Sequence, residues 1–268
     1  MKTTKAILII LLIAFLLVLI FGVIAILVLA LSGASLAGWF NWFGESDNLV
    51  LEKTYETSEF KNLDVFSTVG NIKIENSDTK DVTVKIYADD KVKEGASSEI
   101  KDETLNVKMK ESDSNCHFLC FTKNPKIVIS MPSEFAGKIN VKSSTGNVRI
   151  GSFKDAEMIV DLSTGNTKIE AGKNLDLNSS TGNIEVETGY NRVKIHNDTG
   201  NVKVEKLELL EDSEIMSDTG NVKVKEPGDN VYVEAKNDTG HSDIQGENDR
   251  KADVKLYIEV DTGNINVR

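Results

Sequence analysis

The chain has 268 residues, of which 40% are hydrophobic and 27% charged, and its formal net charge at pH 7 is −11. This acidity argues against nucleic acid as a partner, because phosphate binding requires a basic surface. It also argues against electrostatic docking on anionic lipids or polymers unless divalent cations bridge the two surfaces.

The first predicted element is a membrane-spanning helix over residues 6–31. This stretch contains neither a charge nor a proline, and at about 1.5 Å per helical residue it outspans a hydrocarbon core about 30 Å thick. Lys2 and Lys5 are the only charges before it, so the positive-inside rule places residues 1–5 in the cytoplasm. Small residues at 32–35 leave a cleaved secretory signal open, although the apolar part of such signals runs only about 7 to 15 residues.

Residues 32–48 form a predicted juxtamembrane linker. The linker contains both tryptophans of the chain, Trp39 and Trp42, each followed by a phenylalanine. Amphipathic rings settle at the headgroup level of a bilayer, so we expect an aromatic belt at the outer interface. The predicted localisation is therefore the cell membrane, with a single span, a cytoplasmic N-terminus and an extracellular domain of residues 49–268.

The extracellular domain is organised by a repeated tripeptide, Thr-Gly-Asn in its commonest form, with about 19 residues between copies. Apolar residues stand five positions before and four positions after each repeat glycine, and polar residues alternate with them. This alternation predicts a strand, a turn and a second strand, with one face of each strand buried. The predicted turn glycines are Gly70, Gly146, Gly165, Gly182, Gly200, Gly220, Gly240 and Gly263.

The pattern predicts an all-β fold. A repeat of this length cannot bury its own apolar face, so neighbouring repeats must stack. We favour a β-solenoid, a parallel β-helix-like array with one repeat per rung, because the same bend recurs at a nearly constant period. An antiparallel β meander or sandwich, in which Thr-Gly is a hairpin turn, stays open because periodicity alone does not decide.

In the solenoid, the residue after each glycine would stack on its equivalents as a hydrogen-bonded asparagine ladder. His241 stands in one of these positions and would break the ladder. The predicted members are Asn71, Asn147, Asn166, Asn183, Asn201, Asn221 and Asn264.

Residues 78–132 keep the alternation of apolar and polar residues that is typical of strands, but they lack the repeat glycine. We expect degenerate rungs here, with an insertion that carries Cys116 and Cys120. A local disulfide between these cysteines is the leading interpretation, because compartments outside the cytosol are oxidising. A zinc site that includes His117 is the alternative, but a second ligand pair at finger spacing is missing.

The later turns read Asp-Thr-Gly, at Asp198, Asp218, Asp238 and Asp261, which imitates the aspartic-protease signature. Turn chemistry explains them better, because serine replaces aspartate in earlier copies and either side chain can accept a backbone N–H of the turn. Carboxylates stacked about 4.8 Å apart would repel one another, so bound calcium is a secondary hypothesis. No cofactor is expected.

The recurring Ser/Asp-Thr-Gly-Asn-Val/Ile motif, together with the strand at 127–132, resembles the bacterial "putative adhesin" family, a β-strand-repeat domain of unknown function that is often membrane-anchored. The resemblance covers residues 49–268. It implies a β-solenoid on the cell envelope with no established catalysis.

We therefore expect a membrane-anchored surface binding module without catalysis. Its expected partners are the lipid bilayer, through one helix, and an unidentified envelope polymer or surface protein. One alternative is a regulatory or structural partner in an envelope-stress or membrane system, in which the helix makes the specific contact. Another is a carbohydrate-active β-helix enzyme, since polysaccharide lyases also use parallel β-helices.

Overall fold

The computed structural model describes residues 46–89, 95–110, 124–245 and 249–268. Across these residues no helix is long and apolar enough to cross a membrane. The predicted span at 6–31, the tryptophans Trp39 and Trp42, and the cysteines Cys116 and Cys120 lie outside the described residues. Residues 45–268 form one compact unit, whose described part consists of strands and one short 3₁₀ helix. The all-β prediction is confirmed.

The elements of this unit, in chain order, are β1 (Leu49–Glu56), η2 (Thr57–Glu59), β2 (Asn62–Ser67), β3 (Asn71–Ser77), β4 (Asp81–Tyr87), β5 (Ala96–Lys101), β6 (Thr104–Met109), β7 (Lys126–Pro132), β8 (Lys138–Thr145), β9 (Val148–Ser152), β10 (Glu157–Thr164), β11 (Thr167–Thr181), β12 (Ile184–Thr199), β13 (Val202–Lys206), β14 (Ser213–Thr219), β15 (Val222–Glu226), β16 (Val231–Thr239), β17 (Ser242–Ile244), β18 (Val254–Thr262) and β19 (Ile265–Val267).

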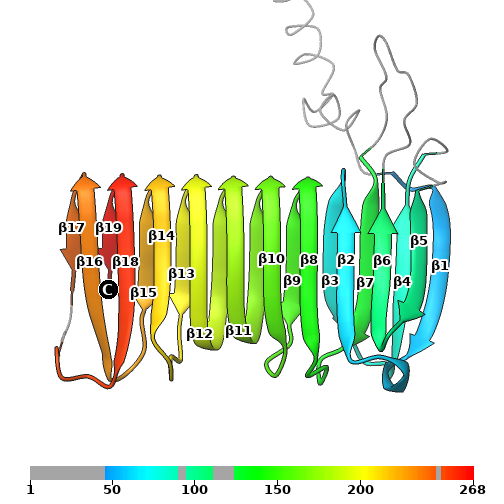
Figure 1. Ribbon diagram of the computed structural model, residues 1–268, viewed down its shortest axis with the longest axis horizontal. Helices are drawn as coiled ribbons and strands as arrows, with labels where there is room; N and C mark the ends of the chain where they lie inside the picture. The colour runs from blue at the N-terminus through cyan, green and yellow to red at the C-terminus, as the bar shows by residue number, and fades with distance from the viewer. Residues whose placement is uncertain (1–45, 90–94, 111–123, 246–248) are drawn as a thin grey trace, which may run out of the picture. The chain divides into compact units, whose positions relative to one another are not determined.

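The repeats stack as a parallel β-solenoid (Figure 1). Each rung has one strand that enters the Thr-Gly-Asn turn and one that leaves it. Entering strands pair in parallel with entering strands, so that Val141 of β8 lies opposite Val160 of β10. Leaving strands do the same, with Ile150 of β9 opposite Ile169 of β11. The antiparallel meander is therefore wrong for the repeat block.

The solenoid interior is filled by the aliphatic positions that the repeat predicts. Leu177, five residues before its glycine, and Val204, four residues after its glycine, are both fully buried. The polar residues that alternate with them face outward and are partly or fully exposed. Burying an aliphatic side chain contributes about 1.5 to 3 kcal/mol, and one such layer repeats in every rung. The core is therefore a continuous apolar column shared by all rungs.

The last two rungs are stacked in the reverse of their chain order. Both β14 and β16 pair with β18, and both β15 and β17 pair with β19. The rung of Gly263 therefore lies between those of Gly220 and Gly240 (Figure 1). Stacking strictly in chain order is wrong here. The interior residues of the Gly240 rung, Ala235 and Ile244, are only partly buried, because β16 and β17 have no second partner among the described strands.

The opposite end shows a similar departure from chain order. The β2/β3 rung lies between the β6/β7 rung and the β8/β9 rung. Residues 78–132 thus contribute one parallel rung in their described part rather than several degenerate rungs. The remaining strands pair antiparallel, β1 with β4, β4 with β7 and β5 with β6. Asp102 and Glu103 between β5 and β6 both have positive φ, at 49° and 57°, which is the geometry of a tight hairpin turn.

Candidate functional site

The repeat glycines line up along one edge of the solenoid, where the rungs approach most closely. Gly182 has a φ of +150°. A Cβ atom at this position would lie 1.7 Å from the carbonyl oxygen of Gly165 in the neighbouring rung. A side chain here would force the two rungs apart, so the close approach itself requires glycine.

The asparagines after these glycines form a ladder along the same edge. Asn166 donates its backbone N–H to Oδ1 of Asn147 at 2.9 Å, and its Nδ2 reaches the same oxygen at 3.3 Å. The same backbone contact links Asn71, Asn147, Asn166, Asn183, Asn201, Asn221 and Asn264 in spatial order. His241 does not interrupt the ladder. It lies at the end, donating its N–H to Oδ1 of Asn264 at 3.1 Å, because its rung is the terminal one.

The outward residues two positions before the repeat glycines from Gly146 onward form a second line, which we call the turn-entry row. In spatial order it reads Ser144, Ser163, Ser180, Asp198, Asp218, Asp261 and Asp238. Its four carboxylates lie on consecutive entering strands, about 4.8 Å apart. Within the described part of the chain, the one lysine ion pair of this row joins Lys236 to Asp238 at 3.8 Å. The row therefore changes from neutral hydroxyls to acids midway along the solenoid.

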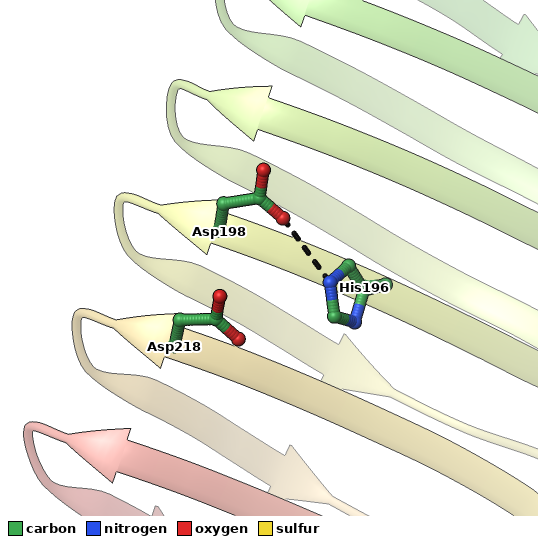
Figure 2. A group of neighbouring side chains, drawn as sticks. All are labelled: His196, Asp198 and Asp218. Carbon is green, nitrogen blue, oxygen red and sulfur yellow. Dashed lines mark ion pairs between the residues drawn. The ribbon is translucent and has the colours of Figure 1, made fainter.

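A histidine joins this row where the hydroxyls give way to acids. Figure 2 shows His196 and Asp198 on the same face of β12, with Asp218 of β14 beside them. His196 Nε2 lies 3.1 Å from Asp198 Oδ1. One potential ligand atom from each of the three residues lies within 4.8 Å of the others. The side chains of all three are at least partly exposed.

The repeat motif alone does not identify this group of three. The motif groups the aspartates by their shared turn and assigns no role to His196. The signal was present as His-x-Asp, since residues two apart on a strand point to the same side. Calcium was the ion suggested for Asp198, Asp218, Asp238 and Asp261, and the first two now share a cluster with an imidazole.

A groove runs along the entering strands beside this cluster. Its volume is about 280 Å³, and its lining includes Asp161, Ser180, His196 and Asp198. A second groove, of about 560 Å³, lies on the leaving strands and is lined by the asparagine ladder together with Lys73, Arg149 and Lys168. Both grooves are lined mainly by polar side chains, and the first places the histidine next to hydroxyls and carboxylates.

The leaving strands carry an ion-pair row, in which several lysines and glutamates of neighbouring rungs pair with one another. Lys203 lies 2.9 Å from Glu185 and 2.6 Å from Glu205, and Glu205 also pairs with Lys225. Hydrogen bonds from Lys203 and Lys225 lower the pKa of Glu205 to about 2. The same glutamates raise the pKa of Lys203. This face is electrostatically compensated, in contrast to the turn-entry row.

The stacked rungs, the glycine edge and the asparagine ladder define a parallel β-solenoid repeat domain. The chain belongs to the Toastrack DUF4097 family, whose model matches residues 60–268. This match confirms the family resemblance that the Thr-Gly-Asn motif indicates. No curated protein matches the chain.

The chain is also similar to solved structures. A "putative adhesin" from Bacteroides fragilis NCTC 9343 is 22% identical with a TM-score of 0.54, over 84% of this chain and 99% of that chain. A "putative cell adhesion protein" from Clostridium sporogenes ATCC 15579 is 14% identical with a TM-score of 0.44, over 81% of this chain and 98% of that chain. The likeness to the first of these establishes the shared fold.

Proposed function

We propose that the chain is a cell-surface binding module, anchored in the membrane by residues 6–31 and acting without catalysis through the outward face of its solenoid. The observation that carries the proposal is the regularity of this face. Neighbouring rungs present equivalent polar side chains in register, for example Lys142, Asp161 and Asn178 on adjacent entering strands.

A regular polar face suits a linear partner such as an envelope glycan or an extended surface protein. Adjacent strands repeat about every 4.8 Å, so a chain lying along the solenoid meets an outward side chain at the same spacing on every rung. The outward side chains also bond one another, as Lys142 and Asn178 both do with Asp161, at 3.5 Å and 3.0 Å. Such preorganisation reduces the entropy lost when a partner binds.

The proposed anchor and orientation rest on the sequence. Residues 6–31 are uncharged, and Lys2 and Lys5 lie before them, which favours a cytoplasmic N-terminus and an external solenoid. The descriptions of the proteins from Bacteroides fragilis and Clostridium sporogenes as adhesion proteins are in keeping with a binding role.

The experiment compares cells that express four forms of the full chain, in adhesion to immobilised cell-wall glycan and to untreated cells of the same strain. The first form is the unchanged chain, and the second carries an unrelated apolar helix in place of residues 6–31. The third has Asp161→Lys and Asp176→Lys on the entering face. The fourth has Glu134→Lys and Asp155→Lys, the same change in charge at the edge where the entering strands begin.

We expect adhesion in the first, second and fourth forms and its loss in the third. Loss on helix exchange with retention in the third form would overturn the proposal and favour a regulatory partner that acts through its helix. Absence of adhesion in every form would also contradict it. Release of soluble sugar from the glycan by the purified chain would replace the binding role with an enzymatic one.

A further inference from the structure

His196, Asp198 and Asp218 have the composition and the spacing of a metal-ligand set. We propose that they form a binding site for one divalent first-row transition-metal ion, of the class of Zn²⁺. Each side chain supplies one ligand atom, an imidazole nitrogen or a carboxylate oxygen. The remaining coordination positions face solvent, which is the arrangement of an open site. The proposal is independent of the adhesive role.

The first two ligand atoms are already close to the separation that a bound ion requires. At a tetrahedral angle, zinc bonds of about 2.0 to 2.2 Å to nitrogen and oxygen place neighbouring ligand atoms about 3.3 to 3.6 Å apart. His196 Nε2 and Asp198 Oδ1 are 3.1 Å apart, so a small adjustment suffices. The side chain of Asp218 lies within 4.8 Å and forms no hydrogen bond or ion pair with a described residue. A change of rotamer at this exposed side chain therefore completes the set at little cost.

The negative charge of the two carboxylates also favours the binding of a cation. Asp198 and Asp218 stand in equivalent positions on neighbouring strands, where like charges are destabilising. Among the described residues no lysine or arginine lies within ion-pair distance of either carboxylate. Lys194, two residues before His196 on the same face, forms no such pair. The residues in register beside His196 are Asn178 and Met216, neither of which brings a charge.

The imidazole decides which ion the site prefers. Calcium takes six to eight oxygen ligands, whereas imidazole nitrogen suits zinc, copper and nickel. This mixed set therefore selects a transition metal over calcium, the ion first suggested for the Asp-Thr-Gly turns.

The site occurs once along the described rungs. The residue four positions before the glycine is histidine only in the Gly200 rung. The equivalent Glu259 is engaged by Tyr257 at 2.9 Å and by Lys236. In the terminal rung the equivalent is Lys236 itself, which pairs with Asp238. One ion per solenoid is the expected stoichiometry.

The test is a competition titration of Zn²⁺ and, separately, Ca²⁺ against a chromophoric chelator, with the full chain in detergent micelles. His196→Asn and Asp218→Ser remove one ligand each. They introduce residues that the same positions carry in neighbouring rungs, Asn178 and Ser180, so both variants are expected to fold. Asp238→Ser is the matched control, because it removes an acid of the same row that lies away from the histidine. Cys116, His117 and Cys120 are present in every form, so any zinc bound there cancels in the comparison.

We expect the unchanged chain and Asp238→Ser to bind Zn²⁺ equally, and His196→Asn and Asp218→Ser to bind it at least about ten-fold more weakly. Calcium is expected to compete poorly in all four forms. Equal zinc affinity in all four forms would overturn the proposal. So would an equal loss in Asp238→Ser, which would indicate diffuse attraction to the acidic row, or preferential binding of calcium.

Discussion

Asn264 donates its backbone N–H to Oδ1 of Asn221 at 3.0 Å, although the two residues are 43 positions apart. Chain order would have placed His241 in this position. Because the rung of Gly263 enters the stack before that of Gly240, the amide ladder stays continuous and the histidine falls at its end. The 20-residue step from Gly220 to Gly240 passes over the position of the Gly263 rung, and the next 23 residues return by one rung.

The asparagine ladder should contribute more inside the stack than at its end. Asn183→Ala removes the acceptor for the backbone N–H of Asn201, which is 3.0 Å away, and we expect a loss of about 1 to 2 kcal/mol. His241→Ala is the matched change, because no neighbouring N–H among the described residues depends on its side chain. It should cost less than about 0.5 kcal/mol. Thermal unfolding followed by circular dichroism measures both changes, and equal shifts would contradict the role of the ladder.

The turn glycines should tolerate a side chain less well than a glycine outside the glycine edge. Gly182→Ala places a Cβ 1.7 Å from a carbonyl oxygen, and we expect a cost of about 3 kcal/mol or more. Gly189 has a φ of +88°, but a Cβ atom added there would lie 3.4 Å from its nearest neighbour. Gly189→Ala should therefore lower the free energy of unfolding only by the strain of alanine in a left-handed backbone conformation, about 1 to 2 kcal/mol. The midpoints of chemical unfolding measure the loss of stability in Gly182→Ala and in Gly189→Ala. A larger loss at Gly189 would rule out close approach as the reason for the turn glycines.

The reversed rung order predicts different costs for two equivalent isoleucines. Ile169, in the middle of the stack, is 0% exposed, and Ile169→Ala should destabilise by about 2 to 5 kcal/mol. Ile244 has the same position in the terminal rung and is only partly buried. Ile244→Ala should therefore cost about 1 kcal/mol, since less apolar area is lost. If Ile244→Ala proved as costly as Ile169→Ala by thermal unfolding, the Gly240 rung would lie inside the stack.

The ion-pair row predicts a stability that decreases as the pH falls into the acidic range. The pKa of Glu205 falls from 4.5 to about 2 on folding, so its contribution is fully present above pH 4.5 and is lost as the pH falls toward 2. The Tm difference between the unchanged chain and Glu205→Gln should be largest near neutral pH and should narrow over this window. Glu170→Gln is the control, because Glu170 faces outward on the same column without an ion pair among the described residues. A Tm difference between the unchanged chain and Glu205→Gln that stays constant with pH would contradict this prediction.

The interior and the edge of the solenoid follow from local pattern, but the rung order does not. Val224 finds an aliphatic partner whether its neighbour is Val267 or Ile244, so the repeat fits either order equally well. Periodicity therefore carries no information about the order of the rungs. The hairpin at Asp102 and Glu103 was hidden for a related reason, because neither residue is the glycine or asparagine that usually adopts positive φ.

The repeat pattern does not identify the candidate metal site, because the pattern describes only what the rungs have in common. The repeat shows what the rungs share, whereas the residue four positions before the glycine differs from rung to rung and is histidine only in the Gly200 rung. Only the structure shows that this exception stands next to the first carboxylates of the turn-entry row. In a repeat protein, departures from the pattern are therefore where a single site should be sought.

The most direct test of a stacked solenoid with a polar face outside the cell is labelling by a membrane-impermeant maleimide. The parent chain carries Cys116→Ser and Cys120→Ser, and Arg149→Cys or Ile150→Cys is added to it. Arg149 is exposed and Ile150 is fully buried, although they are neighbours in β9. We predict labelling of Arg149→Cys on intact cells and protection of Ile150→Cys until the chain is unfolded. Labelling of Arg149→Cys only after lysis, or equal labelling of both positions on intact cells, would contradict the account.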